Sequence, residues 1–218
     1  MSRTLSLTRI VALAAVALIL TGSTGCTFLS QVIMTLEDRR VPADFAGLEG
    51  KKVAVVCLDA HTLRSTGGEA DALARAVGKE LAANVKDVQI ISEAKIADWM
   101  DQKDEVIDFR DVAKGVKADM VIGIDLKSFS IHEPGGTLLK GRTTVEAKVY
   151  DMTKPQAPVY TIEETPIAFP ESGARHVTEN EASFRLLFIQ QIAHRLAKNF
   201  YAYDKTVDFN SDAKFIGD

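Results

Sequence analysis

The chain has few cysteines for a protein of its length. Only Cys26 and Cys57 occur among its 218 residues. A disulfide-rich framework needs several pairs of cysteines, so the small secreted domains held together by disulfides are excluded. Cys57 lies inside the apolar run Val53–Leu58, and this position predicts a buried, inert thiol.

Positive charge is not in excess. The chain has 26 Lys and Arg against 30 Asp and Glu, which gives a net charge of −4. Residues 1–25 contain Arg3 and Arg9 and no acidic residue, so the remainder of the chain carries −6. Binding to nucleic acid depends on concentrated Lys and Arg, and we therefore expect no nucleic-acid partner.

The sequence also lacks the spacings of a metal or phosphate site. Its four histidines are far apart, and none stands at a zinc-ligand spacing from a cysteine or another histidine: His61, His132, His176 and His194. Gly67-Gly68 precedes an expected helix, but the Lys-Ser/Thr of a phosphate-binding loop does not follow it. We predict no metal and no cofactor, and interpret the two glycines as an N-terminal turn.

The first 25 residues have the organisation of an export signal. Arg3 and Arg9 precede Ile10–Leu20, which is an uninterrupted apolar stretch, and small residues then lead to Cys26. Eleven helical residues extend about 16 Å, whereas the hydrocarbon of a bilayer is about 30 Å thick. The stretch is therefore too short for a stable membrane span and predicts a secretory signal.

The end of this leader resembles the bacterial lipobox. Thr24-Gly25-Cys26 matches the lipobox pattern, in which the cysteine takes a diacylglycerol before cleavage, whereas Ser23 stands where a Leu-like residue is usual. The resemblance implies cleavage between Gly25 and Cys26 and a multiply acylated (palmitate-bearing) Cys26. Thr27, in place of the Asp that retains some lipoproteins at the inner membrane, implies the outer membrane. An ordinary signal peptide cut near Gly25 and an uncleaved anchor are the alternatives.

We expect four segments along the chain. A lipoprotein signal peptide covers residues 1–25, the anchor and linker 26–49, an α/β domain 50–203 and a polar tail 204–218. Apolar residues recur at helical spacing in the linker and predict a short amphipathic helix, which either lies close to the lipid or packs on the body: Phe28, Leu29, Val32, Ile33 and Leu36.

The pattern after Gly50 predicts a mixed α/β fold. The expected elements are strands at 53–58, 88–91, 118–131, 143–151 and 159–168, and helices at 69–85, 93–101, 109–117 and 181–203. Ser92 and Asp108 are the expected N-caps of the second and third helices. The first strands are continuously apolar, as in a sheet covered on both faces, while 143–151 alternates between apolar and polar residues. We predict a three-layer-like mixed sheet with flanking helices, parallel strands first, an antiparallel hairpin after them and a long C-terminal helix.

This order of elements resembles a family of envelope domains. Lys51–Val56, Ala118–Gly123 and Val149–Thr153 carry the likeness. They resemble strands of the domain shared by the curli secretion lipoprotein, the amino-terminal domain of TolB and the penicillin-binding-protein activator LpoB. The resemblance covers roughly residues 50–203. It implies a docking or assembly module and carries over no catalytic residue.

Several residues are candidates for a catalytic or a binding site. Cys57 and His61 would approach as nucleophile and base, and Asp59 and Asp125, at or near the ends of neighbouring strands, would form a carboxylate pair. A basic patch on the last helix would include Arg185, His194, Arg195 and Lys198. For each of these, the structural interpretation (a core thiol, turn-capping acids and a solvated helix face) is preferred. The hairpin tip with His132, Glu133 and Gly135 is the candidate contact site for a protein partner, and a solvated turn is its alternative.

The sequence therefore predicts a non-enzymatic cell-envelope lipoprotein. Cys26 would tether it to membrane lipid so that the domain faces the periplasm and docks a protein partner. An exported hydrolase using Asp59 or Asp125 is the alternative, and self-assembly of several copies is a third interpretation.

Overall fold

The computed structural model describes residues 40–59, 68–103, 108–136, 138–171, 173, 175–176 and 180–204. The chain divides into two units, Met1–Arg40 and Val41–Asp218. The leader, Cys26, the expected linker helix, His61 and the tail beyond residue 204 lie outside the described residues.

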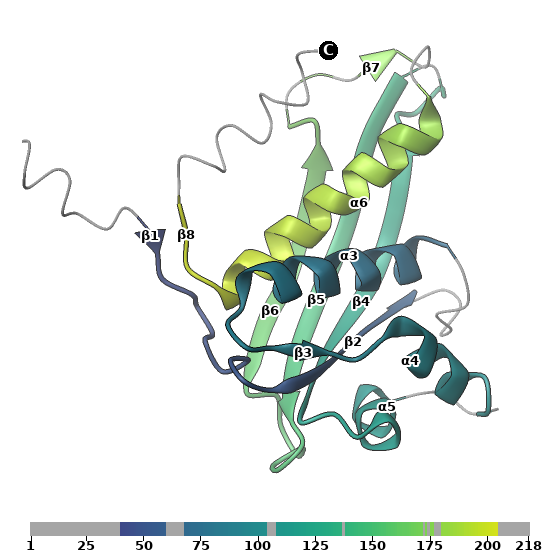
Figure 1. The fold of residues 1–218 in the computed structure, drawn as a ribbon. Helices are drawn as coiled ribbons and strands as arrows, with labels where there is room; N and C mark the ends of the chain where they lie inside the picture. The colour runs from purple at the N-terminus through teal and green to yellow at the C-terminus, as the bar shows by residue number, and fades with distance from the viewer. Residues whose placement is uncertain are drawn as a thin grey trace, which may run out of the picture. The chain divides into compact units, whose positions relative to one another are not determined.

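A mixed sheet forms the centre of the second unit, as predicted (Figure 1). Its strands run in the order β3-β2-β4-β5-β6, with β7 paired to β5. The strands are β2 (Lys52–Asp59), β3 (Gln89–Ile90), β4 (Met120–His132), β5 (Leu138–Asp151), β6 (Tyr160–Phe169) and β7 (Arg175–His176). β1 (Arg40–Val41) and β8 (Tyr203–Asp204) form a separate two-stranded sheet.

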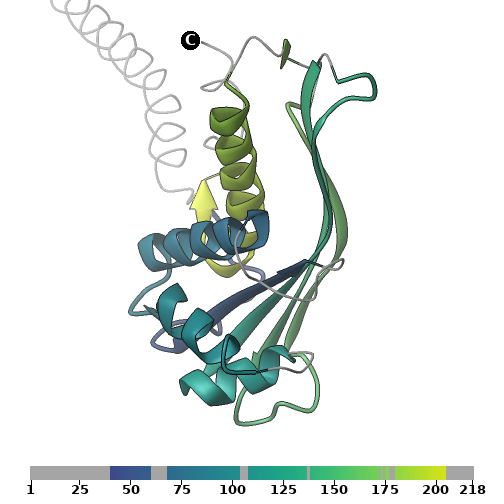
Figure 2. The same cartoon turned by 90° about the vertical axis from the view of Figure 1, so that its right-hand side faces the viewer.

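The helices cover the sheet unequally. They are α3 (Glu69–Asn84), α4 (Glu93–Met100), α5 (Phe109–Val116) and α6 (Glu181–Ala197), which continues into the 3-10 turn η1 (Lys198–Phe200). α3 and α6 lie on one face of the sheet, as Figure 2 shows, and the larger core fills the space between them and β2, β4 and β5. α4 and α5 pack on the other face, over β2 and the start of β4.

The directions of the strands follow the sequence pattern. β2 pairs in parallel with both β3 and β4, whereas β5 is antiparallel to both of its neighbours, β4 and β6. The continuously apolar β2 is buried on both faces from Val53 to Leu58. In β5, Val145, Ala147 and Val149 are buried and the residues between them are not. Both strand types were therefore predicted correctly.

Five local features differ from the expectation. β5 begins at Leu138 instead of Thr143, the expected loop 170–178 contains β7, and α6 ends at Ala197 rather than Tyr203. Ser92 is the N-cap of α4, but its side chain makes no capping hydrogen bond. Leu48, placed by the sequence in the linker, is fully buried in the core.

Candidate partner-binding site

The β4–β5 hairpin carries the residues that the sequence proposed as a contact site. Its tip is closed by hydrogen bonds from Gly136 N to Glu133 O (3.0 Å) and from Glu133 N to Leu138 O (3.0 Å). Gly135 has φ 104° and Gly136 φ 72°, a backbone region that side chains disfavour. Two glycines at the tip therefore permit this tight turn.

Two side-chain contacts hold the end of the hairpin, one to α6 and one within the hairpin itself. His132 Nε2 lies 3.2 Å from Oε1 of Glu181, at the start of α6, and Arg142 Nη2 donates to Oε1 of Glu133 at 2.7 Å. The predicted contact residues are thus held against α6 and β5. Whether a partner uses them stays a prediction.

A polar cleft of about 470 Å³ lies beside the part of β4 that leads to the hairpin tip. Five of its polar side chains come from four elements: Asp59, Glu69, Ser128, Ser130 and Arg185. His132 completes the lining, and Arg185 makes an ion pair with Glu69 across 116 residues of sequence. The cleft lies at the carboxyl end of β2 and the start of α3, where α/β sheets commonly bind ligands.

The sequence pattern did not identify this cleft as a unit. Asp59, His132 and Arg185 were predicted in three separate contexts, and Glu69 was only the first residue of an expected helix. Nothing in local spacing could have joined them, because α6 reaches α3 only through the tertiary fold.

The expected carboxylate pair does not form. Asp59 and Asp125 do lie on neighbouring strands, but the register pairs Leu58 with Asp125 and Asp59 with Leu126. Successive side chains on a strand point to opposite faces, so the two carboxyl groups lie on opposite sides of the sheet. Asp59 and Asp125 therefore do not act together at one site.

Asp125 has an unusual environment of its own. Burial raises the pKa of its carboxyl group, and Glu146 adds to this effect, while Lys148 and Lys127 oppose it. Hydrogen bonds from Lys148 and Lys127 lower the pKa of the Glu146 carboxyl group. These four charged groups lie on the side of the sheet away from α3 and α6 and largely neutralise one another.

Cys57 is fully buried, as the sequence predicted. Burial, followed by the nearby charges of Asp125, Asp71 and Asp59, raises the pKa of its thiol. A nucleophilic cysteine must be accessible and able to form the thiolate, so this environment does not support catalysis. The proposed base, His61, lies outside the described residues.

The cations expected as a basic patch on α6 have acidic neighbours. Arg185 pairs with Glu69, Arg195 pairs with Glu171, and His194 Nδ1 lies 3.8 Å from Oε2 of Glu80. A surface neutralised in this way does not present concentrated positive charge to an acidic partner.

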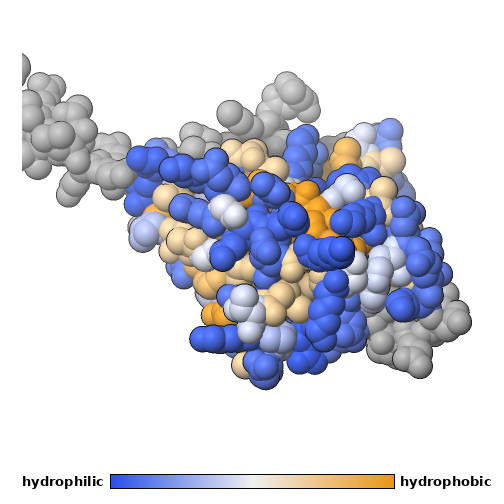
Figure 3. Space-filling view, turned by 60° about the horizontal axis from the view of Figure 1, so that its bottom comes forward, coloured by the Kyte–Doolittle hydropathy of each residue, from blue (hydrophilic) through white to orange (hydrophobic). Residues whose placement is uncertain are grey.

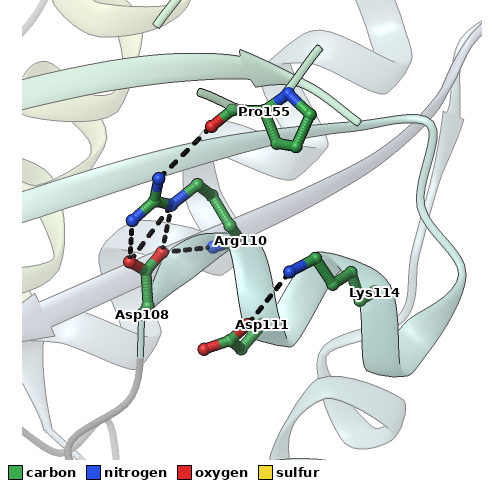
Figure 4. A network of polar contacts seen from close by, with 5 residues as sticks. All are labelled: Asp108, Arg110, Asp111, Lys114 and Pro155. Carbon is green, nitrogen blue, oxygen red and sulfur yellow. Dashed lines mark hydrogen bonds and ion pairs between the residues drawn. The ribbon is translucent and has the colours of Figure 1, made fainter. Parts of the chain in front are cut away.

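A second polar network joins α5 to the turn between β5 and β6 (Figure 4). Asp108 caps α5 by accepting from Arg110 N at 2.8 Å, as the sequence predicted, and it also holds the Arg110 guanidinium. Arg110 Nη1 then donates to Pro155 O at 3.3 Å. Hydrogen bonds from Arg110 lower the pKa of Asp108. The network stabilises the fold, and its charges are satisfied internally.

Among the helices that the structure describes, none combines the length and apolar content needed to cross a membrane. Within the same described ranges, no three His, Cys, Asp or Glu side chains converge as a metal site. Hydrophilic residues cover most of the face in Figure 3, and hydrophobic residues occupy only small areas between them.

Several solved structures are similar to part of this chain. No family model and no curated protein matches it. Similar solved structures include the PelC dodecamer from Paraburkholderia phytofirmans (12% identity, 74% of this chain and 95% of that chain, TM-score 0.43). They also include the LpoB C-terminal domain from Salmonella enterica (10%, 56% and 87%, 0.39). A minor lipoprotein from Acinetobacter baumannii is a third (13%, 70% and 92%, 0.38).

The predicted resemblance is confirmed at this level, because LpoB is one of the proteins that it names. With TM-scores below 0.5, these similarities assign no role to any residue of this chain.

Proposed function

We propose that the protein is a lipid-anchored, non-enzymatic component of the bacterial cell envelope whose α/β domain docks a protein partner. The observation that carries the proposal is the position of Cys26, which follows an 11-residue apolar stretch and the small residues Thr24 and Gly25. In this proposal residues 1–25 are removed and residues 26–49 form the anchor and linker, whose end packs into the domain through Leu48. Residues 50–203 form the docking domain and 204–218 are a tail.

Physical reasoning supports anchoring through more than one acyl chain. A single chain holds a protein to a bilayer only marginally, whereas two or more hold it stably. In this proposal Cys26, as the mature amino terminus, carries several acyl chains. Position 27 holds Thr instead of the Asp that retains some lipoproteins at the inner membrane. This favours the outer membrane, with the domain facing the periplasm.

Docking rather than catalysis fits the state of the polar groups near the cleft. His132, Glu133 and Glu69 are each engaged with another side chain, and Asp59 is separated from Asp125 by the sheet. Active sites instead gather titratable groups that act together on one substrate atom. The hairpin tip, held against α6 and beside a cleft, supports a rigid surface for a protein contact.

The anchor is tested by mass spectrometry of the protein isolated from membranes. We expect a mature chain that begins at an acylated Cys26. In Cys26→Ser the acyl mass disappears and the protein is released by alkaline extraction. Cys57→Ala, which removes the other cysteine, is the matched control and keeps the lipid. A chain that retains Met1 without modification contradicts the proposal.

The docking surface is tested by photo-crosslinking in intact cells. A crosslinking residue replaces Glu133 at the hairpin tip, or the exposed Gln102 in the turn after α4 as a control. We expect a discrete adduct with one envelope protein from position 133 and none from 102. Identical adducts from both positions, or no adduct from 133, contradict a contact at the hairpin.

A further inference from the structure

One edge of β2 is left without a strand partner over most of its length. β3 pairs with β2 only at Lys52 and Val53, whereas β4 pairs with it from Val53 to Asp59. After β3 the chain turns away into α4. Among the described residues, no strand lies along this edge beyond Val53.

The hydrogen bonds at the start of β2 show which backbone groups face this edge. Gln89 N donates to Lys51 O and Ile91 N to Val53 O, each at 2.9 Å. In a parallel strand alternate residues direct their N–H and C=O groups to the same side. Val55 and Cys57 therefore direct their N–H and C=O groups toward the unpaired edge. Both residues are nevertheless buried, with 5% and 0% of their surface exposed.

A groove of about 270 Å³ lies along this edge, between α3 and α4. Val55, Val56 and Cys57 form its floor, and its walls consist largely of small or apolar residues: Ala74, Gly78 and Ala82 on α3, and Ile96 and Ala97 on α4. Buried backbone N–H and C=O groups almost always have a partner in a working protein. A narrow apolar groove whose floor carries main-chain groups that no described strand pairs therefore has the features that bind an extended peptide.

An ion pair connects the two walls of the groove. Arg75 of α3 donates to both carboxylate oxygens of Glu93 of α4, each at 2.5 Å, and the two side chains are 64% and 37% exposed. Exposed ion pairs contribute little to stability, so a ligand can displace this contact at little cost. When the Arg75–Glu93 ion pair is broken, Arg75 and Lys79 present positive charge on the α3 wall, and Glu93 presents negative charge on the α4 wall.

We propose that an extended segment of a partner protein binds in this groove as an additional strand along β2. Main-chain hydrogen bonds to Val55 and Cys57 would provide the register. Small side chains would fit the α3 and α4 walls, with an acidic residue toward Arg75 and Lys79 and a basic residue toward Glu93. This inference does not depend on the lipid anchor or on the hairpin contact.

A second copy of this chain is a poor occupant. The other edge of its sheet is β6, in which Glu163, Glu164, Thr165 and Pro166 are exposed and the pairing with β5 is irregular. Charge, proline and bulges are the features that prevent an edge strand from pairing with another chain. A single flexible segment can enter between α3 and α4, whereas a strand with its own sheet behind it cannot.

The test uses the full chain in mild detergent and a displayed library of eight-residue peptides. The tightest peptide is synthesised, and each of its amides is N-methylated in turn. We expect methylation at alternate residues to weaken binding at least tenfold and at the intervening residues less than threefold. Selection of no binding peptide, or an effect of methylation without this period of two, overturns the proposal.

Matched variants locate the binding. Ala97→Trp and Ala82→Trp fill the groove and are expected to weaken binding at least tenfold, while Ala94→Trp and Ala83→Trp, exposed on the same helices but outside the groove, retain it. Equal binding by all four variants overturns the proposal.

Amide exchange on the unmutated chain gives a readout that does not depend on whether these variants fold. The amides of Val55 and Cys57 should exchange faster than those of Ala54 and Val56, and the peptide should slow them. Equal protection without peptide means that the edge is already paired, and the inference is then wrong.

Discussion

The two halves of the sheet illustrate two ways of using a β-strand. In the parallel half, β2 and the start of β4 are covered by α3 on one face and by α4 and α5 on the other. In the antiparallel half, α6 covers one face of β4 and β5, and the opposite face carries Lys127, Glu146 and Lys148. The same sheet is therefore a buried layer at one end and a boundary with solvent at the other.

Gly123 marks the border between the halves. It lies in β4, and a Cβ atom at this position would stand 2.3 Å from the Phe109 ring of α5. The next residue of β4 on this face, Asp125, is no longer covered by the α4–α5 core, which ends with residues such as Val121 and Leu58. Because Gly123 has no side chain, the Phe109 ring of α5 can lie directly against β4 near the end of the region that α4 and α5 cover.

The largest effect is expected from a charge placed on the same face in each half. Val56→Asp buries a carboxylate under α4 and α5, where the native residue is 1% exposed. It should lower the free energy of unfolding by about 4 kcal/mol or more. Thr144→Asp, on the half-exposed open side of β5, should cost less than about 1 kcal/mol. Urea unfolding measures both, and similar losses would mean that the two halves are equally covered.

A smaller loss is expected at the border itself. Gly123→Val forces the Phe109 ring to move and should destabilise the protein by about 1–3 kcal/mol. Combining it with Phe109→Ala removes the clash, so the double variant should lose less than the sum of the two single changes. Strictly additive losses in urea unfolding would show that Phe109 does not rest on Gly123.

The two helices that cover only the parallel half should respond differently to removal of their N-caps. Asp108 caps α5 and holds Arg110, so Asp108→Ala should cost about 1–2 kcal/mol. The Ser92 side chain makes no capping bond to α4, so Ser92→Ala should change stability by less than about 0.5 kcal/mol. Thermal unfolding of both variants distinguishes them, and equal losses would contradict the difference in capping.

The smallest effects, with opposite signs, are expected from two carboxylates that face each other on the open side. The pKa of Glu146 is lowered in the folded protein, so its charge stabilises the fold above the unfolded-state pKa, and this contribution is lost as the pH falls through the folded pKa. Glu146→Gln should therefore reduce stability at neutral pH by up to about 1 kcal/mol.

Asp125 should behave in the opposite way. Burial raises its pKa, so its charged form costs stability at neutral pH, and that cost disappears as the pH falls through the raised pKa. Asp125→Asn should stabilise the protein slightly at pH 7 and not at about pH 3. Urea unfolding at both pH values checks the two variants, and a change of the same sign for both at pH 7 would contradict these assignments.

The elements themselves could largely be predicted from local patterns. The continuous run Val53–Leu58 indicated burial on both faces, and the alternation around Val145 and Val149 indicated a strand with one open face. The boundaries were less accurate at β5 and α6. Pairing with β4 extends β5 to Leu139 and pairing with β7 extends it to Leu138, while the last turn of the helix tightens at Lys198. Asp108 was identified as a cap since that function depends only on residues near it in sequence.

The candidate sites could be predicted only in part. The hairpin tip was visible because Gly135 and Gly136 follow a strand. The cleft could not be predicted, because Arg185 of α6 and Glu69 of α3 are far apart in sequence and meet only in the folded protein. The groove along β2 was also invisible, because it results from the shortness of β3 and the separation of α3 and α4, neither of which any residue spacing encodes.

By itself the sequence determined the hydrophobic period of each segment, and hence which segments become helices, buried strands or half-buried strands; its leader also predicts Cys26 as the lipid attachment point. Only the tertiary structure decided which side chains share a face. The register of β2 with β4 separates Asp59 from Asp125, and the early end of β3 leaves Val55 and Cys57 facing a groove. The reason is that periodicity is a property of neighbours along the chain, whereas register and packing depend on contacts between residues that are far apart in it.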